Sequence, residues 1–226
     1  MIVRLLFALA AVLLAFAPAS ADELTERVKR LTSASGKYQR PRVPMLPSMK
    51  ERMSDMRLKL EHIESPIGSI LIAHDGKQIC NLEFTDCEDR MQRMLARHFD
   101  GVEIERSKQR TKFGQALQRY FKGDVTAIDK LPVAKLGTPF QQRAWAALRR
   151  IPAGETRSYG QQARAIRAPN AARAVGLANH LNPIGIVVPC HRVRGADGSL
   201  TGYAGGLERK RWLIEHEARS VRRTSV

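Results

Sequence analysis

An apolar run meets a proline, a thiol, an imidazole and a guanidinium within eight residues: Ile186-Val187-Val188-Pro189-Cys190-His191-Arg192-Val193. Its apolar, β-branched residues predict a buried strand. Pro189 cannot donate a ladder hydrogen bond, so the strand should end there, with Cys190 at its exit. Successive strand residues point to opposite faces, so Cys190 and His191 can cooperate only if a turn begins at Pro189. Free cysteine is often an inert core residue, so the stretch alone leaves packing and chemistry both open.

Composition indicates a basic, globular protein. The chain has 226 residues, enough for one or two domains with a core. It carries 38 Lys and Arg against 22 Asp and Glu, a formal net charge of +16. This excess favours polyanionic partners, above all nucleic acid, although charge alone gives only non-specific attraction. The cysteines Cys80, Cys87 and Cys190 lack the spacing of a disulfide framework or a Cys-rich zinc site. We interpret Cys80 and Cys87 as packing residues and expect no metal.

The first 55 residues predict a leader and an unstructured connector. A basic start, the apolar run Leu5–Ala17 and the small residues at 19–21 are typical of a secretory signal. Residues 33–50 are rich in Ser, Gly, Lys, Arg and Pro, which is typical of a disordered segment. Either the protein is exported, or translation starts at Met45, Met49, Met53 or Met56. We favour an internal start and a cytoplasmic protein, with export as the alternative.

Residues 56–130 predict an N-terminal α+β domain. Strands are expected at Arg57–Ile63, Ser69–Ala73, Gln78–Phe84 and near Val102–Glu105. Turn signals at residues 65–68 and at Asp75-Gly76 separate the first three strands. Thr85-x-x-Glu88 is a capping-box pattern that predicts a helix to about His98. A second helix is expected at Lys112–Phe121.

Residues 131–226 predict a mostly helical C-terminal domain. Thr138-Pro139-Phe140-Gln141 combines three helix-start signals and predicts a helix to about Arg150. Ser158-x-x-Gln161 caps a helix from Tyr159 to Ile166, and another follows from Asn170 to about Leu181. Two short helices across a tight turn fit a helix-turn-helix. A last helix is expected at Lys210–Ala218.

Glu217 is the residue in the last helix that suggests chemistry. Leu213, Ile214 and Glu217 fall on one helical face, and a carboxylate among apolar residues must be paired. It either forms a structural salt bridge with an arginine or orients His191, which would then activate Cys190. A cysteine, a histidine and a carboxylate together are the arrangement that activates a thiol nucleophile.

From residue 121 onward the sequence resembles the O6-alkylguanine-DNA alkyltransferases (methylated-DNA–protein-cysteine methyltransferases), especially the bacterial stand-alone type. The matching motifs are Phe121-Lys122-Gly123, Gly137-Thr138-Pro139-Phe140-Gln141, Ile151-Pro152-Ala153-Gly154-Glu155-Thr156, Ser158-Tyr159-Gly160, Ala172-Arg173-Ala174-Val175-Gly176, Asn182-Pro183, Pro189-Cys190-His191-Arg192-Val193, Gly202-Tyr203-Ala204-Gly205-Gly206-Leu207 and Glu217. Residues 56–120 resemble the family's N-terminal domain more loosely, and residues 1–55 have no counterpart.

The resemblance implies both a fold and a reaction. The fold would be α+β, with an N-terminal ribonuclease H-like domain and a C-terminal winged-helix-like domain. Cys190 would take the alkyl group from O6-alkylguanine, and from O4-methylthymine, as a stable thioether, in a single-use reaction without a cofactor. His191 would act as a base through a water molecule, and Glu217 would orient His191. The partner would be double-stranded DNA carrying the lesion, bound by a monomer in the cytoplasm.

The resemblance also implies roles in base extrusion, which is needed because the lesion lies inside a stacked duplex. Arg173 would fill the vacated stack, Tyr159 would contact the phosphate and the flipped base, and Asn182 would act as a hinge. Other residues implied in DNA contact or base reading are Ala171, Ala174, Val175, Ala178 and Arg192, with backbone groups of Cys190, Val193 and Ala204.

Two other classes of protein remain possible from the residues alone. A DNA-binding module without chemistry would need no thiol, so the joint presence of Cys190, His191 and Glu217 argues against it. A secreted cysteine hydrolase is favoured only by the leader. The sequence departs from the family pattern at Gln161-Gln162 and at Arg167, which lies in the turn between the two helices and could add a phosphate contact.

Overall fold

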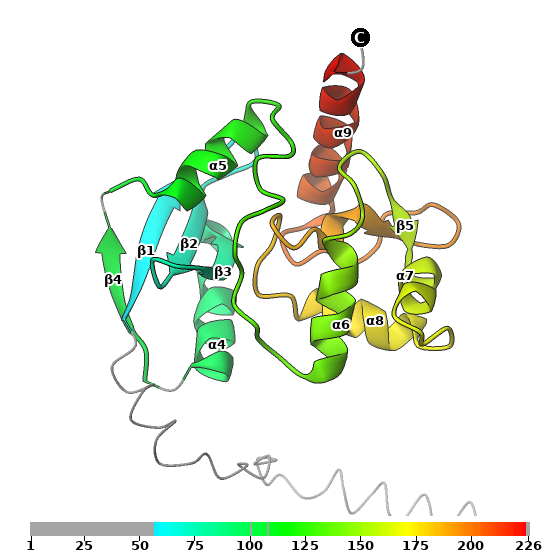
Figure 1. Cartoon of the computed structure of the whole chain (residues 1–226), viewed down its shortest axis with the longest axis horizontal. Helices are drawn as coiled ribbons and strands as arrows, with labels where there is room; N and C mark the ends of the chain where they lie inside the picture. Colours follow the sequence, from blue (N-terminus) through cyan, green and yellow to red (C-terminus); the bar gives the residue numbers. More distant parts are fainter. Residues whose placement is uncertain (1–56, 100, 108, 225–226) are drawn as a thin grey trace, which may run out of the picture. The chain divides into compact units, whose positions relative to one another are not determined.

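The computed structural model describes residues 57–99, 101–107 and 109–224, all within one compact unit that spans residues 46–226. The predicted leader, connector and alternative starts lie outside the described residues. Within the described part of the chain, no helix is long and apolar enough to cross a membrane. The predicted α+β class, with a small N-terminal sheet and a mostly helical C-terminal part, is confirmed (Figure 1). The boundary between residues 130 and 131 stays a prediction.

The sheet contains four strands in the order β3-β2-β1-β4 (Figure 1). The strands are β1 (Arg57–Ile63), β2 (Ile70–His74), β3 (Ile79–Phe84) and β4 (Glu103–Ser107). β2 pairs antiparallel with β1 and β3, whereas β4 lies parallel to β1. The turn after Asp75 forms as predicted, because Asp75 Oδ1 accepts hydrogen bonds from the backbone N–H groups of Lys77 and Gln78.

Two helices cover opposite faces of this sheet. Met91 and Leu95 of α4 (Glu88–His98) pack with Leu58 and Leu71. Phe113, Leu117 and Tyr120 of α5 (Lys112–Phe121) pack with Ile70 and Ile72 on the other face. Because strand residues alternate between faces, β2 contributes Leu71 to the cluster under α4 and Ile70 and Ile72 to the cluster under α5.

The predicted capping box at Thr85 is wrong. Residues Thr85–Cys87 form a separate 3₁₀ turn, η2, so α4 begins only at Glu88 and its cap, Cys87, makes no side-chain hydrogen bond. The acidic residues Glu88 and Asp89 in the first turn still complement the helix dipole.

Within the described residues, the C-terminal part contains four α-helices and a two-stranded parallel sheet. They are α6 (Pro139–Leu148), β5 (Arg157–Ser158), α7 (Tyr159–Ala165), α8 (Ala172–His180), β6 (Val193–Arg194) and α9 (Leu207–Thr224). Both predicted capping boxes are confirmed, at Thr138 with Gln141 and at Ser158 with Gln161. The turn between α7 and α8 contains Arg167 in the left-handed region, with φ of 59°.

The predicted strand at residues 186–188 is wrong, although its residues are buried. Val188 N–H donates to Ile184 C=O at 3.0 Å, so the chain turns instead of extending. Ile186 has a φ of 65°, which is incompatible with a strand. The predicted turn at Pro189 is confirmed, because the 3₁₀ turn η3 (Cys190–Arg192) follows it directly.

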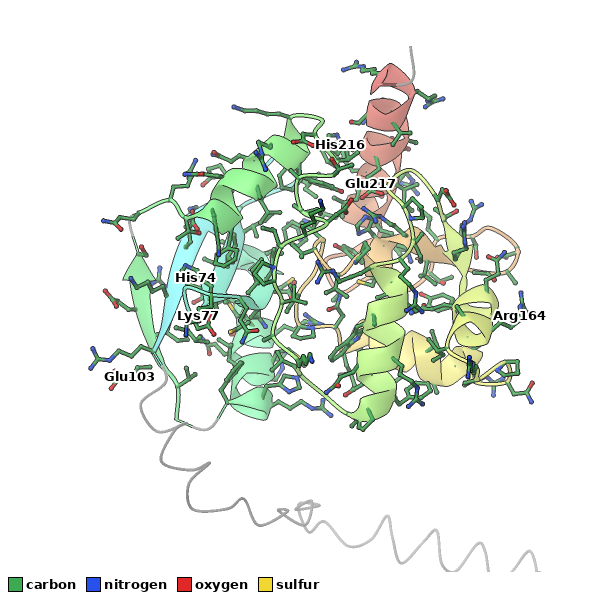
Figure 2. The ribbon with its side chains drawn as sticks, in the orientation of Figure 1. His74, Lys77, Glu103, Arg164, His216 and Glu217 are labelled. Carbon is green, nitrogen blue, oxygen red and sulfur yellow. The ribbon has the colours of Figure 1, made fainter. Side chains whose placement is uncertain are left out.

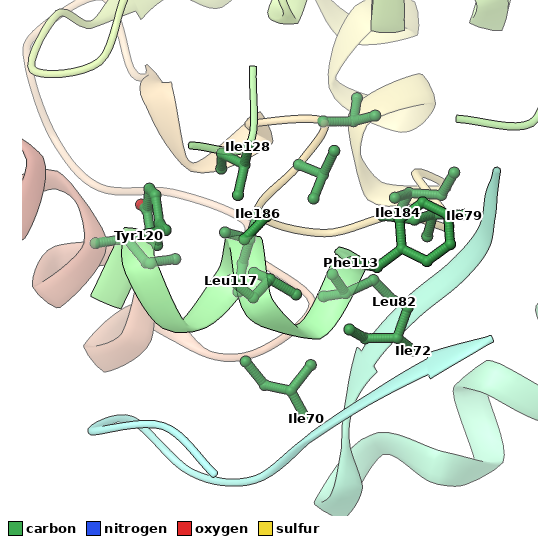
Figure 3. Packing of buried hydrophobic residues seen from close by; sticks show 14 of the residues in the cluster. Ile70, Ile72, Ile79, Leu82, Phe113, Leu117, Tyr120, Ile128, Ile184 and Ile186 are labelled. Carbon is green, nitrogen blue, oxygen red and sulfur yellow. The ribbon is translucent and has the colours of Figure 1, made fainter. Parts of the chain in front are cut away.

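This turning segment packs on the core of the N-terminal sheet. Ile184 and Ile186 belong to the same buried cluster as Ile72 and Phe113 (Figure 3). At the free edge of β3, Leu82 N–H donates to Pro183 C=O at 3.0 Å and Leu82 C=O accepts from Gly185 N–H at 3.2 Å. The segment that precedes Cys190 is therefore held by both apolar packing and backbone hydrogen bonds.

Candidate active site

Cys190 is the first residue of η3 and is half-buried. Its Sγ lies 3.5 Å from Nδ2 of Asn182. A cavity of about 20 Å³ adjoins it, lined from the C-terminal part by Cys190 and Tyr203 and from the N-terminal sheet by Glu83. A space of this size holds about one water molecule.

Asn182 holds the Cys190 segment in its turned conformation. Its Nδ2 donates to Val188 C=O at 2.8 Å, and its Oδ1 accepts from Ile184 N–H at 3.0 Å. The side chain is buried. These bonds satisfy backbone groups that a strand ladder would otherwise have paired, because the segment forms no strand. Asn182 thus connects the fold of residues 182–188 to the position of the thiol.

Glu217 lies on α9, where Figure 2 labels it. Its side chain is buried and is the centre of a polar network. Its Oε1 lies 2.9 Å from His191 Nε2 and accepts from the Tyr120 hydroxyl at 2.8 Å. Arg192 donates to both carboxylate oxygens, from Nε at 2.9 Å and from Nη2 at 2.8 Å. Gly154 N–H donates to Oε2 at 3.3 Å. Glu217 therefore contacts both of the partners considered for it, an arginine and His191; its part in orienting His191 for chemistry stays a prediction.

The electrostatic state of the network follows from burial and these bonds. Burial alone would raise the pKa of Glu217, but His191 and Arg192 outweigh it and hold that pKa well below its usual range. Burial lowers the pKa of His191, and Glu217 only partly offsets this effect. At neutral pH the stable arrangement is thus a carboxylate, a guanidinium and a neutral imidazole.

A neutral His191 can act as a base. With Nε2–H directed to Glu217, the tautomer leaves Nδ1 as an acceptor. Nδ1 is buried and has no hydrogen-bond partner in the described part of the chain. Burial raises the pKa of the Cys190 thiol, while the Asn182 amide and Lys210 oppose that rise. A thiol with a raised pKa needs such a base to become a nucleophile.

Sequence reasoning missed Lys210 and Tyr120. Lys210 is fully buried on α9, and its Nζ donates to Thr201 C=O at 2.6 Å in the loop that leads to Tyr203. Lys210 precedes Glu217 by seven residues, so helical periodicity places both on one face and could have revealed it. Nothing in the sequence around Tyr120 points to Glu217, which lies 97 residues further along the chain.

The structure contradicts the sequence prediction that Arg192 contacts DNA, because its side chain is buried. Only 3% of its side chain is exposed. It donates to Glu217 and, through Nη1, to Ile151 C=O at 2.6 Å. A group with these bonds has no surface to offer to a phosphate.

The predicted DNA-contact residues on α8 divide into an exposed and a buried set. Arg173 and Ala174 are exposed, and Ala171 is half-buried. Val175 and Ala178 instead pack against α6 and α7 in a small alanine-rich core, so their predicted place on the groove face is wrong. Leu177, which the sequence analysis did not single out, is 61% exposed on the same helix.

The remaining predicted residues lie around the thiol. Tyr159 is half-buried, and its hydroxyl donates to Thr201 C=O at 3.1 Å. Val193 is buried directly after η3. Ala204 lines the small cavity together with Cys190. Among the described residues no group of three or more His, Cys, Asp or Glu side chains could hold a metal ion.

The fold and this site define a class of protein in which a cysteine, followed by a buried histidine bound to a glutamate, accompanies two short helices joined by a tight turn. The family of 6-O-methylguanine DNA methyltransferases matches the chain twice: the ribonuclease-like domain matches residues 58–134 and the DNA binding domain matches residues 139–219. The chain belongs to this family, which confirms the resemblance stated from its motifs.

Individual relatives agree with the family assignment. The methylated-DNA–protein-cysteine methyltransferase of Salmonella typhimurium is 45% identical over 165 residues, which are 72% of this chain and 96% of that protein. That of Mycobacterium tuberculosis is 48% identical over 158 residues, 69% of this chain and 89% of the relative. The crystal structure of Mycobacterium tuberculosis OGT in complex with DNA is similar with a TM-score of 0.61 and 43% identity, covering 72% of this chain and 94% of that one.

Proposed function

We propose that the protein repairs DNA by irreversible transfer of an alkyl group from O6-alkylguanine to Cys190. One observation carries this proposal: the thiol, held by Asn182, immediately precedes a neutral, buried His191 whose other ring nitrogen is bound by Glu217. A network with this geometry serves thiol activation. Family membership supplies the reaction class, since the relatives are named for methylated DNA and a protein cysteine.

The chemistry balances within the protein and its substrate. His191 Nδ1 takes the thiol proton, through one intervening water molecule, as the sulfur attacks the alkyl carbon. The sulfur–carbon bond forms as the bond between that carbon and O6 breaks, and the proton passes to the leaving guanine. Glu217 stabilises the transient imidazolium, because Nε2 is 2.9 Å from its carboxylate. No cofactor is needed, and the stable thioether ends the protein's activity.

Guanine must enter a site that is too narrow for a base in this structure. The cavity beside Cys190 is about 20 Å³, far smaller than a base. We infer that the loop carrying Tyr203 and Ala204 moves when DNA binds. Backbone groups of Cys190, Val193 and Ala204 would then read the base edge and O6.

Extrusion of the base would use the exposed surface of α8. Arg173 is free to enter the duplex and replace the flipped base, with Ala171 and Ala174 allowing close approach to the minor groove. Tyr159 would contact the adjacent phosphate. Double-stranded DNA with an O6-alkylguanine lesion is the proposed substrate, O4-methylthymine a second one, and a cytoplasmic monomer the proposed form.

The test of this proposal counts the lesions that are repaired in DNA per molecule of protein. A duplex with one O6-methylguanine is incubated with limiting protein, and guanine restored is compared with protein added. We expect one lesion repaired per molecule and none with Cys190→Ala. Cys87→Ala, which removes another half-buried thiol, should repair like the wild type. Continued turnover, or repair by Cys190→Ala, would overturn the proposal.

A further inference from the structure

A polar hollow lies outside the thiol site, between α7 and the loop that follows β6. It has a volume of about 460 Å³, and its lining includes Arg157, Ser158, Arg164, Arg194 and Asp197. The three arginines come from three different segments of the chain: β5, α7 and the end of β6. Their convergence on one hollow distinguishes them from arginines scattered over a basic surface.

The charges of the hollow are available to a ligand. The side chains of Arg164 and Arg194 are exposed and form no hydrogen bond or ion pair within the described ranges 57–99, 101–107 and 109–224. Arg157 is paired with Glu155 at 2.6 Å. The carboxylate of Asp197 accepts from the N–H and the hydroxyl of Ser199. The guanidinium groups of Arg164 and Arg194 therefore share the hollow with the single carboxylate of Asp197, and its net charge is positive.

The Arg164 side chain is turned toward the start of its own helix. Its Nη1 lies 3.7 Å from the position that a Cβ on Gly160 would take, so the guanidinium lies beside the first turn of α7. Figure 2 shows Arg164 on the outer side of α7. The Arg194 guanidinium lies beside Gly198, 3.9 Å from the corresponding Cβ position. Neither position buries the charge, so neither arginine is there to stabilise the core.

The hollow is directly connected to the thiol site by the β5–β6 ladder. Arg157 pairs with Val193 and Ser158 with Arg194. β6 begins immediately after the η3 turn that starts at Cys190, and Tyr159 follows Ser158 directly. The lining of the hollow is therefore joined to the thiol site through two short backbone connections.

We propose that this hollow binds the phosphate backbone of the substrate duplex, on the stretch of DNA that flanks the extruded base. The inference rests on the proposed function and adds to it a second contact region, separate from α8. Guanidinium groups bind phosphate oxygens by charge and by paired N–H donors. DNA phosphates are closely spaced, which suits two arginines that line one hollow. Contacts of this kind position the protein without reading sequence.

The experiment measures how the affinity for an undamaged duplex depends on salt. The double variant Arg164→Gln/Arg194→Gln should weaken binding at low salt, and its log–log salt slope should be shallower by about 0.9 for each phosphate that the protein no longer neutralises. Asp197→Asn removes the opposing charge while keeping an acceptor for Ser199, so it should tighten binding. Arg93→Gln/Arg97→Gln, which removes two exposed arginines of α4, should leave the slope unchanged.

Alkyl transfer from a free benzylated guanine base separates this inference from the proposed function. The Arg164/Arg194 variant should react with the free base at the wild-type rate, because neither residue lines the thiol cavity. If wild type reacts with neither base nor duplex, the proposed function fails. If wild type repairs but the double variant keeps the wild-type salt slope, or the α4 control changes equally, the phosphate site is disproved. Binding of inorganic phosphate with an unchanged DNA slope would also contradict it.

Discussion

Glu217 shows how one side chain can hold both a structure and a reactive group. It connects α9 to α5 through Tyr120, to the break after α6 through Gly154, and to η3 through His191 and Arg192. A buried carboxylate with this many donors stays ionised, and its charge is what allows His191 to become protonated transiently.

Glu217→Gln should slow alkyl transfer by roughly tenfold or more, because a neutral amide cannot stabilise the imidazolium. The rate is measured with the free benzylated base. Duplex affinity should stay near that of wild type, because the Glu217 side chain is only 1% exposed. Circular dichroism checks folding, since Arg192 would no longer have a charged partner. An unchanged rate in a folded variant would reduce Glu217 to a structural residue.

Arg173→Ala should reduce repair of a duplex much more than reaction with the free base. The side chain is exposed on α8 and is not part of the hydrogen-bonded network around the thiol, so its loss should affect base extrusion and not the chemistry. Arg173→Lys serves as the matched control that keeps the charge but not the planar group. Equal losses on both substrates would argue against a role in base flipping.

The residue types in the sequence predicted the main residues of the candidate active site but not every residue of the buried network around Glu217. Cys190, His191 and Glu217 follow from a thiol, an imidazole and a carboxylate on an apolar helical face. Arg192 was assigned to DNA contact from the family resemblance; only the fold shows that it is buried against Glu217. Tyr120 reaches the network across a long chain separation, which no local pattern reports.

At the scale of elements, the Asn182 side chain supplies hydrogen bonds that a strand ladder would otherwise supply to the segment before Cys190. The apolar residues at 186–188 predicted a strand because burial and β-branching are shared by strands and by buried turns. The turn forms instead because one amide pairs with Val188 C=O and Ile184 N–H and leaves Ile186 in the left-handed region. Capping boxes were predicted well at Thr138 and Ser158. At Thr85 the same pattern failed because a 3₁₀ turn precedes the helix.

Asn182→Ala should destabilise the protein by about 2–4 kcal/mol, because it leaves buried backbone groups unpaired, and should slow alkyl transfer. Asn182→Asp separates the two halves of the amide: it keeps the acceptor for Ile184 N–H but removes the donor to Val188 C=O and Cys190 Sγ. We expect Asp to recover less than half of the stability that Ala removes. Urea unfolding measures the stabilities; an Asn182→Ala variant as stable and reactive as wild type would contradict the assigned role.

For the whole molecule, stability should fall as pH drops below the usual histidine range. Burial lowers the pKa of both His74 and His191, and both are essentially unexposed. Above about pH 6.5 neither state binds these protons; below it the unfolded chain binds them and the folded protein does not. The stability present above that pH therefore declines on acidification, by at most about 1.4 kcal/mol per pH unit for each histidine.

Urea midpoints at pH 7.5, 6.5 and 5.5 measure this decline. Glu217 adds a second decline only below its unfolded pKa of about 4.3, because its folded pKa is also lowered. A midpoint that stays constant or rises between pH 7.5 and 5.5 would show that the buried histidines become protonated without cost.

The overall α+β architecture could be predicted because strand alternation, turn residues and helix caps are local signals. The way in which the N-terminal sheet packs against the C-terminal part could not be predicted. It depends on the edge of β3 meeting Pro183 and Gly185, and on Arg90 of α4 donating to the carbonyls of His180 and Asn182 at 2.7 and 3.0 Å. Such interactions link residues far apart in sequence and have no periodic signature.

The central claim is that Cys190 accepts the alkyl group, and intact-protein mass after incubation with an O6-methylguanine duplex tests it most directly. We predict a gain of one methylene per molecule, located by peptide mapping on Cys190 and absent from Cys190→Ala. A protein of unchanged mass, or a methyl group found on any other residue, would contradict it.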